Sequence, residues 1–432
     1  MKMLASDAAE GIGGQLIGPD LEFDGVSFDT RSLAAGQLFV PIIAERNGHE
    51  FIGNAYAAGA ALHLTSEPDD FRLNHTSIEV ADTAAALMAL AATARNRSSA
   101  RVVGVTGSVG KTSTKDLIAA ACGTHFRTAA NERSFNNEQG LPISILNAPD
   151  NTEVLVLEMG MRGFGEISSL CEVAQPEIGV VTAVGQSHTE RVGGIEGVAT
   201  AKRELIEALP KSGTAVLNAD DHRVAGMSRY AGASVLTYGM TGEVRIVDLE
   251  LDSFARPRFS VQTPWGTARV ELAVSGKHMA MNAAGAIAVA GALGVDVDAA
   301  AAGLAEAGIS EMRMAVNELS SGAVIVDDTY NANPTSMAAA LDAVIAMAAE
   351  RRFAVLGEMG ELDDPAAGHR EVARHAEALG VELVAVGTDL YGVRPTAHPV
   401  AALGDLGPGD VVLVKASRSA GLERLVADLV NR

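Results

Sequence analysis

The residues with the clearest chemical meaning form a glycine-rich loop. The segment reads Gly104-Val-Thr-Gly-Ser-Val-Gly-Lys-Thr112, with an apolar run before it and a helix-compatible run after it. A loop in that order can wrap its backbone N–H groups around an anion at a helix N-terminus. Lys111 can reach the outer phosphates of a nucleotide, and the Thr112 hydroxyl can bind Mg²⁺. The loop therefore predicts a site for a nucleoside triphosphate, with a glycine-rich turn that binds nothing as the alternative.

Two more candidate side chains follow apolar runs that have the character of buried strands. Glu158 closes the run 154–158, and His188 comes soon after the run 178–182. A carboxylate at the carboxyl end of a strand beside a phosphate loop offers a hard oxygen ligand for Mg²⁺. Glu158 could equally cap a helix or lie on the surface, and a lone histidine is more often a packed residue than a ligand. The positions at strand ends favour a role at the nucleotide.

Lys202 lies in the middle of a helix that we expect over residues 196–209. Val198 and Ile206 stand four residues before and after it, so Lys202 falls inside the apolar stripe of that helix. A lysine in such a place usually extends its ammonium group to water. As a neutral amine it could instead add CO₂ and become a carbamate, which is an anionic oxygen ligand. The residues alone favour the first interpretation.

Four polar segments could also contact a ligand. Asp327-Asp-Thr-Tyr-Asn-Ala-Asn-Pro334 and Lys415-Ala-Ser-Arg-Ser419 each follow an apolar run directly. The first could instead be an Asx-rich turn before a helix that starts at proline, and the second could hold an anionic group. Nearer the N-terminus, Asp29-Thr-Arg31 and Glu45-Arg-Asn-Gly-His-Glu-Phe51 combine arginine, glycine and an aromatic ring. These two could bind a nucleotide or a diphosphate, but they are weak motifs.

The elements that must position these residues are those of an α/β protein. Buried strands are expected over 154–158, 178–182 and 214–218, and again over 323–326, 353–356, 382–386 and 411–414, with helical patterns between them. A hairpin is expected at residues 263–266 and a buried helix over 283–295. The polar segment 96–100 has the composition of a linker. We therefore predict three domains, with a small α/β domain in 1–98, a doubly wound P-loop domain with a β-rich insert in 99–308, and a Rossmann-like domain in 309–432.

Composition restricts the class of protein further. The chain has 432 residues and a net charge of −21, which disfavours nucleic-acid binding and docking on an anionic membrane. Only Cys122 and Cys171 occur, which leaves no disulfide framework and no zinc ribbon. No signal peptide and no stretch long enough to span a membrane is recognised, so a cytoplasmic protein is expected.

Taken together, these segments resemble the Mur ligase family. The glycine-rich loop is similar to that family's signature, and the further matching segments occur in the expected order. They are Phe135-Asn-Asn-Glu-Gln-Gly-Leu-Pro142, Leu157-Glu-Met-Gly160, Ala201-Lys-Arg-Glu204 and Leu217-Asn-Ala-Asp-Asp221. The segments 327–334, 355–362 and 415–419 look like the branch of the family that adds D-alanyl-D-alanine, and the resemblance covers essentially the whole chain.

The resemblance implies an ATP-dependent amide ligase. The carboxylate of UDP-N-acetylmuramoyl-tripeptide would accept the γ-phosphoryl group of ATP, and the amine of D-alanyl-D-alanine would then displace phosphate from the acyl phosphate. One Mg²⁺ would be held by Thr112 and Glu158, and a second by His188 and a carbamylated Lys202. Domain closure is expected, because the two kinds of substrate contact come from different domains. A monomer is expected, although the sequence does not determine the oligomeric state.

The same resemblance assigns the remaining site residues to groups. ATP would contact Gly107, Ser108, Val109, Gly110, Lys111, Thr112, Asn282, Arg313 and Asp328. The peptide and the UDP-sugar would contact Asn136, Asn137, Glu138, Asp29, Thr30, Arg31, Arg46, Gly48 and His49. The remaining substrate-binding residues would be Tyr330, Asn331, Asn333, Lys415, Ser417 and Arg418.

Several positions depart from the family pattern. Val109 stands where asparagine is usual, Thr30 where serine is common, and Ser187-His-Thr-Glu190 where the family has Ala-His-Leu. Asp363-Asp-Pro365 replaces a more glycine-rich loop close to the expected amine site. These differences leave room for a shifted substrate, so one alternative is a related ligase with another amine or carboxylate substrate. A second alternative is a catalytically silent protein that binds nucleotide or UDP-sugar, although the intact residues argue against it, namely Lys111, Thr112, Glu158, His188 and Lys202. A glutaminase-partnered amidating ligase would need the zinc ribbon that the chain lacks.

Overall fold

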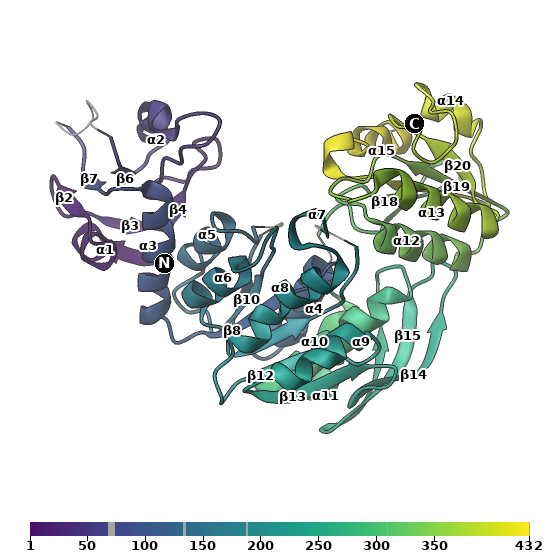
Figure 1. Ribbon diagram of the computed structural model, residues 1–432, viewed down its shortest axis with the longest axis horizontal. Coiled ribbons are helices and arrows are strands. Elements are labelled where there is room, and N and C mark those ends of the chain that lie inside the picture. The colour runs from purple at the N-terminus through teal and green to yellow at the C-terminus, as the bar shows by residue number, and fades with distance from the viewer. Residues whose placement is uncertain (68–73, 133–134, 187–188, 309, 432) are drawn as a thin grey trace.

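A computed structural model describes residues 1–432 except 68–73, 133–134, 187–188, 309 and 432. Three larger sheets, of five, nine and five strands, follow one another along the chain. Figure 1 shows the N-terminal part in purple, the central part in teal and green, and the C-terminal part in yellow-green, arranged as successive lobes. No helix in the described part of the chain is both long and apolar enough to cross a membrane.

The N-terminal lobe is a small α/β unit. Its five strands lie in the order β2-β7-β6-β5-β4, and β1 pairs with β3 beside them. The strands are β1 (Lys2–Leu4), β2 (Gln15–Ile17), β3 (Glu22–Asp24), β4 (Val26–Ser27), β5 (Leu38–Phe39), β6 (Leu62–Thr65) and β7 (Ser77–Glu79). The helices are α1 (Ala5–Ile12), α2 (Ile52–Ala57) and α3 (Thr83–Arg97).

Helix α3 corrects one expectation. Asn96 and Arg97, assigned above to a linker, are the last residues of this helix. The helix continues because Arg95 is buried, and its guanidinium donates to the carbonyl oxygens of Ala174 and Ser98. One apolar core runs without a break from this lobe into the central lobe, where α3 packs on α5 (Gly140–Leu146) and α6 (Glu166–Ala174).

The central lobe contains the nine-stranded sheet, in the order β16-β15-β14-β13-β12-β11-β8-β10-β9. Strands β8 to β13 run parallel, and β14 to β16 add an antiparallel meander whose last hairpin turns between Thr263 and Gly266 as expected. The strands are β8 (Arg101–Thr106), β9 (Thr128–Ala130), β10 (Val154–Glu158), β11 (Ile178–Val181), β12 (Thr214–Asn218), β13 (Ser234–Gly239), β14 (Val244–Leu251), β15 (Pro257–Thr263) and β16 (Gly266–Glu271).

Helices cover both faces of this sheet. They are α4 (Lys111–Gly123), α5 (Gly140–Leu146), α6 (Glu166–Ala174), α7 (Thr189–Val192), α8 (Ile195–Glu207), α9 (His222–Ala225), α10 (His278–Leu293) and α11 (Val297–Ala305). Strand β8 lies between β10 and β11, so the glycine-rich loop emerges at the centre of the parallel sheet. This is the edge at which open α/β sheets bind ligands.

The C-terminal lobe is a second, smaller sheet in the order β17-β18-β21-β19-β20. Its strands are β17 (Ala315–Glu318), β18 (Val324–Asp328), β19 (Arg351–Leu356), β20 (Glu382–Ala385) and β21 (Asp410–Lys415). Its helices are α12 (Pro334–Ala346), α13 (Pro365–Ala378), α14 (Pro399–Leu403) and α15 (Glu423–Val430). Because β18, β21 and β19 are parallel, the polar segments that follow them meet at one edge.

Candidate active site

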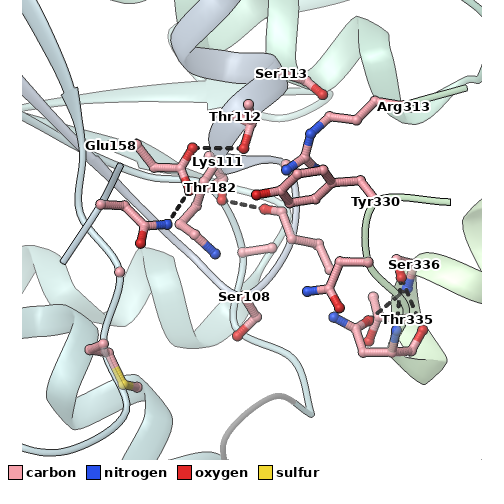
Figure 2. A pocket seen from close by; sticks show the side chains of 18 of the residues that line it. Ser108, Lys111, Thr112, Ser113, Glu158, Thr182, Arg313, Tyr330, Thr335 and Ser336 are labelled. Atoms are coloured by element: carbon pink, nitrogen blue, oxygen red, sulfur yellow. Dashed lines mark hydrogen bonds between the residues drawn. The ribbon is translucent and has the colours of Figure 1, made fainter. Parts of the chain in front are cut away.

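A cavity of about 990 Å³ lies between the central and C-terminal lobes. It is lined by the glycine-rich loop on one side and by the strand ends of the C-terminal sheet on the other (Figure 2). The site residues predicted from the sequence that line it are Ser108, Val109, Gly110, Lys111, Thr112, Asn136, Asn137, Glu138, Glu158, Lys202, Asn282, Arg313, Asp328, Tyr330, Asn331, Asn333, Lys415, Ser417 and Arg418.

The glycine-rich loop turns from β8 into α4 with backbone that only glycine adopts easily. Gly107 has φ +153°, and a Cβ atom there would overlap the Thr182 hydroxyl. Gly110 has φ +80°, and a Cβ atom there would lie 2.8 Å from Asn282 Oδ1. Lys111 folds back over the loop and donates to the Gly107 carbonyl at 2.9 Å. The loop therefore presents its amides and one ammonium group to the cavity at a helix N-terminus.

Thr112 and Glu158 bring two hard oxygens together next to that loop. The Thr112 hydroxyl donates to Glu158 Oε2 at 2.6 Å (Figure 2). Asn136 Nδ2 donates to the other carboxylate oxygen, Oε1, at 2.7 Å. Glu158 is buried at the end of β10. Mg²⁺ in nucleotide sites takes one or two protein oxygens and completes its shell with phosphate and water. The two oxygens fit such an ion, although the described residues contain no group of three or more His, Cys, Asp or Glu that could hold a metal.

Lys202 faces the same cavity from α8 and is only 2% exposed. The interpretation that its ammonium group extends from the helix to outside water is therefore wrong, because the apolar stripe turns inward. Burial holds the pKa of Lys202 well below its usual value, and the positive charge of Lys111 lowers it further, while Glu158 opposes the shift. Burial also lowers the pKa of Lys111, against the opposing effect of Glu158. A buried amine with a lowered pKa is the form of lysine that reacts with CO₂.

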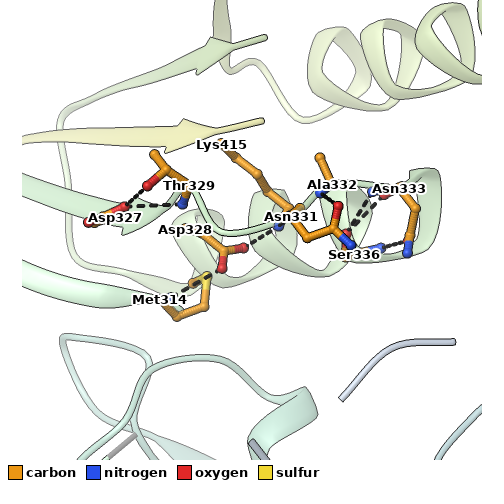
Figure 3. Close-up of polar contacts among 9 residues, drawn as sticks. All are labelled: Met314, Asp327, Asp328, Thr329, Asn331, Ala332, Asn333, Ser336 and Lys415. Carbon is orange, nitrogen blue, oxygen red and sulfur yellow. Dashed lines mark hydrogen bonds and ion pairs between the residues drawn. The ribbon is translucent and has the colours of Figure 1, made fainter. Parts of the chain in front are cut away.

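The C-terminal lobe closes the cavity with an ion pair between two strand ends (Figure 3). Lys415 at the end of β21 donates to Asp328 Oδ2 at 2.5 Å and to the Asn331 carbonyl at 2.8 Å. Asp328 Oδ1 accepts from the Met314 amide at 3.3 Å. The Arg313 guanidinium lies 4.3 Å from the centre of the Tyr330 ring. These contacts fix the polar edge that faces the glycine-rich loop.

Asn333 has a structural role in addition to its place on the cavity. Its side chain accepts from the Ser336 amide, and the Ser336 hydroxyl in turn accepts from the Asn333 amide, which forms a capping box at the start of α12 (Figure 3). Asn331 Oδ1 accepts a hydrogen bond from the Ala332 amide. The Asx-rich turn before Pro334 is thus present at the same place as the cavity wall.

Comparison with known proteins identifies the family. The family model for the Mur ligase middle domain matches residues 105–290, and that for the Mur ligase glutamate ligase domain matches residues 312–418. The UDP-N-acetylmuramoyl-tripeptide–D-alanyl-D-alanine ligase of Mycobacterium tuberculosis is 39% identical over 93% of this chain and 92% of its own length. The chain belongs to the Mur ligase family. The enzyme of the same name from Bacillus subtilis is 35% identical and covers the whole chain.

Solved Mur ligase structures agree with the fold. MurF from Acinetobacter baumannii superposes with a TM-score of 0.88 at 26% identity, covering 100% of this chain and 99% of its own. MurF ligase from Thermotoga maritima, in complex with ADP, superposes with a TM-score of 0.82 at 28% identity. The match covers 94% of this chain and 97% of the Thermotoga chain. The expected α/β architecture of successive Mur ligase units is therefore confirmed.

The first lobe of this Mur ligase carries predicted residues that do not line the cavity. Asp29, Thr30 and Arg31 form a turn in which Arg31 bonds Asp29, and that hydrogen bond lowers the pKa of the Asp29 carboxyl. Arg46 lies over the Phe51 ring.

Two more predicted residues lie in the same lobe. His49 Nε2 accepts from the Ser66 amide. Gly48 packs closely, because a Cβ atom there would lie 2.5 Å from the Ile42 amide nitrogen. In the central lobe, Gly107 lies behind the cavity lining, and His188, predicted as a metal ligand, falls outside the described residues.

The structure adds cavity residues that the sequence reasoning missed. Thr182, at the end of an expected strand, donates to the Val109 carbonyl at 2.6 Å, and its strand-end position was a usable signal. Arg191 and His278 also line the cavity. Met88 comes from α3 of the first lobe, and no local pattern marked it, because its place depends on how two lobes pack.

Proposed function

We propose that this Mur ligase uses ATP to join D-alanyl-D-alanine to UDP-N-acetylmuramoyl-tripeptide through an acyl phosphate. The observation that carries the proposal is the single cavity in which the phosphate loop of the central lobe faces the Asp328–Lys415 edge of the C-terminal lobe. The names of the relatives, over nearly their full lengths, support this choice of substrates. The ADP complex of a structural neighbour supports ATP as the energy source.

The chemistry follows from positioning and charge neutralisation. A carboxylate oxygen of the tripeptide attacks the γ-phosphorus, the bond from that phosphorus to the β,γ-bridging oxygen breaks, and ADP leaves. The amine of the dipeptide then attacks the carbonyl carbon, a proton leaves the nitrogen, and phosphate departs with the former carboxylate oxygen. The loop amides and Lys111 hold the phosphates during both steps. The positive charge of Lys111 and Arg313 at the cavity offsets the charge that develops on the transferred group.

Mg²⁺ fits the oxygens of Thr112 and Glu158, and we propose that these residues hold one ion. His188 and a carbamate on Lys202 would hold a second ion, as the family resemblance implies. When bound, the ions shield the phosphate charges that would otherwise repel the incoming carboxylate. The lowered pKa of Lys202 supports the carbamate, because the free amine is the reactive form. Activity that falls in CO₂-free buffer and returns with bicarbonate would support it further.

The remaining residues are assigned as the family resemblance implies, and many of them line the cavity. For ATP we propose Gly107, Ser108, Val109, Gly110, Asn282, Arg313 and Asp328. For the peptide and UDP-sugar we propose Asn136, Asn137, Glu138, Asp29, Thr30, Arg31, Arg46, Gly48 and His49. For the amine substrate we propose Tyr330, Asn331, Asn333, Lys415, Ser417 and Arg418.

We further propose three domains, 1–98, 99–308 and 309–432, that act in a cytoplasmic monomer. The continuous apolar core between the first two lobes supports motion mainly of the third. Closure of that lobe would bring the amine site toward the acyl phosphate and exclude water from it.

Phosphate release tests the proposed function. The protein is incubated with ATP, Mg²⁺ and UDP-N-acetylmuramoyl-tripeptide, with D-alanyl-D-alanine present or omitted. The mass of the UDP-linked product is then measured by mass spectrometry. We expect continuous release only with both substrates, and a product heavier by the dipeptide. Release with the tripeptide and a different amine would indicate another ligase specificity. If the protein binds ADP but releases no phosphate from ATP with any tripeptide, it is a catalytically silent nucleotide-binding protein.

A further inference from the structure

The helix that carries the phosphate-binding residues also carries an ion pair, between a buried lysine and a partly buried aspartate, that the reaction does not use. Lys115 on α4 is 2% exposed, and its Nζ atom lies 3.0 Å from Asp116 Oδ1. The same Nζ donates to the Asn131 carbonyl at 2.6 Å. A buried cation is costly unless its bonds are satisfied, so this pair is held in one arrangement.

Asn131 ties Lys115 to the strand end that carries Glu158. The Asn131 side chain accepts from the Glu158 amide at 2.8 Å and donates to the Phe135 carbonyl at 3.0 Å. Its own amide donates to the Val156 carbonyl. Lys115 is therefore fixed to the central sheet at the carboxylate proposed to bind Mg²⁺.

The second carboxylate oxygen of Asp116 accepts hydrogen bonds from the segment that joins the central and C-terminal lobes. Oδ2 accepts from both the amide of Ser310, at 2.9 Å, and its hydroxyl, at 2.7 Å. Ser310 lies 194 residues further along the chain, between α11 of the central lobe and β17 of the C-terminal lobe. The chain is thus attached to α4 just before it enters the C-terminal sheet.

Arg313 follows this attachment by three residues and lines the cavity. Its neighbours Met312 and Met314 have φ +60° and +52°, a left-handed conformation that is strained for residues other than glycine. Hydrogen bonds from the Tyr330 amide to the Met312 carbonyl and from the Met314 amide to Asp328 maintain it. The direction of Arg313 therefore depends on a strained segment held at its start by Ser310 and at its end by β18.

We propose that Asp116, held by Lys115, is a positioning residue that sets Arg313 against the nucleotide. The inference rests on the proposed function, in which Arg313 contacts ATP. Thr112 and Asp116 are four residues apart on one helix, about 6 Å along its axis, so the phosphate site and the attachment of Ser310 move as one body. Without the attachment every binding group is still present, but Arg313 is no longer held at a fixed distance from the phosphates.

A double-mutant cycle on ADP affinity tests the proposal. Asp116→Asn weakens the charge-assisted bonds to Ser310, and Ser310→Ala removes one of the two while it leaves the Lys115–Asp116 pair intact. We expect each to raise the Kd for ADP about three- to tenfold. We expect Arg313→Ala to raise it in the unchanged protein but to add less than about twofold in the Asp116→Asn background, because an arginine that is no longer positioned contributes little.

A matched control exists in the first lobe. Asp20 accepts from the amide and the hydroxyl of Ser6 at 2.9 and 2.7 Å, the same chemistry far from the nucleotide. Asp20→Asn and Ser6→Ala should leave ADP affinity and the effect of Arg313→Ala unchanged. Thermal unfolding of all variants identifies any that fail to fold, and Ser310→Ala then carries the test alone.

The outcomes separate the inference from the function on which it rests. Additive effects of Asp116→Asn and Arg313→Ala, or unchanged ADP affinity in Ser310→Ala, would overturn the positioning role and leave the proposed ligase standing. Failure of the unchanged protein to bind ADP would overturn the nucleotide site itself, and the inference with it.

Discussion

Replacing Lys415 by methionine tests how the C-terminal lobe holds its side of the cavity. The change removes two hydrogen bonds, to Asp328 and to the Asn331 carbonyl, and leaves the Asp328 carboxylate without its cation. Removing one partner of a buried ion pair costs about 3–5 kcal/mol. Both groups line the cavity, so water can partly rehydrate the carboxylate, and we take the lower end, about 3 kcal/mol.

Hydrogen exchange measures this loss where it occurs. Strands β18 and β21 pair in register over Val324–Asp328 and Val411–Lys415, and their amides open together. A loss of about 3 kcal/mol predicts exchange that is about a hundredfold faster in peptides from these strands. The double variant Lys415→Met, Asp328→Asn removes the stranded charge but keeps an acceptor for the Met314 amide. It should therefore exchange more slowly than the single variant.

A surface pair supplies the control. Arg97 and Asp7 form an ion pair in which both side chains are well exposed, so Arg97→Met should cost less than about 1 kcal/mol and leave β18 and β21 unaffected. Unchanged exchange of β18 and β21 in Lys415→Met would show that the Lys415–Asp328 pair does not hold these strands together. A double variant whose strands open more readily than those of the single variant would show that the unpaired Asp328 charge is not the source of the loss.

Three further variants test the metal site, the phosphate loop and the pH dependence of stability. Glu158→Gln keeps the shape of the buried acid but weakens a Mg²⁺ ligand, so phosphate release should fall at least about a hundredfold and require more Mg²⁺, as a magnesium titration would show. Gly107→Ala places a methyl group against the Thr182 hydroxyl at positive φ, so ATP binding measured by calorimetry should be lost while the fold remains. His369 is buried and its Nε2 accepts from the Met359 amide, and burial lowers its pKa in the folded protein. As pH falls below about 6.5, His369 is protonated in the unfolded chain before it is protonated in the folded protein, so the free energy of unfolding should decrease from that pH downward. Melting temperatures measured over a pH series should fall less steeply in His369→Gln than in the unchanged protein.

Much of the site could be predicted because strand ends are a local property. An apolar run that closes with Glu158 or precedes Asp327 identifies a strand and its carboxyl end, and parallel strands bring such ends to one edge. The glycine-rich loop needed only its own residues, since Gly107 and Gly110 occupy conformations that other residues resist.

Other features depended on packing between distant segments and had no local signal. The spacing of Val198, Lys202 and Ile206 placed Lys202 in the apolar stripe of its helix, but whether its ammonium group reached outside water or the cavity depended on how α8 packs on the sheet. Residues 96–97 were polar enough to resemble a linker, yet the buried guanidinium of Arg95 extends the helix. The Asp116–Ser310 contact joins residues 194 positions apart, so no pattern within either segment could reveal it.

Asp363-Asp-Pro365 shows how one segment can serve local structure beside a site. The Asp364 side chain accepts from the Ala367 amide, and Pro365 is the first residue of α13, so this departure from the family pattern forms a regular helix start. The residue types alone could not distinguish this role from altered substrate contacts.

The proposed reaction requires that the tripeptide carboxylate itself accept the γ-phosphoryl group, in the cavity beside Lys111 and Glu158. Its most direct test is to label both oxygens of that carboxylate with ¹⁸O and let the substrate react with ATP and D-alanyl-D-alanine. The mass of the inorganic phosphate released is then measured by mass spectrometry. An acyl phosphate transfers one labelled oxygen when the amine displaces phosphate, so we expect phosphate that carries a single ¹⁸O atom. Unlabelled phosphate, or label that appears in AMP, would contradict it.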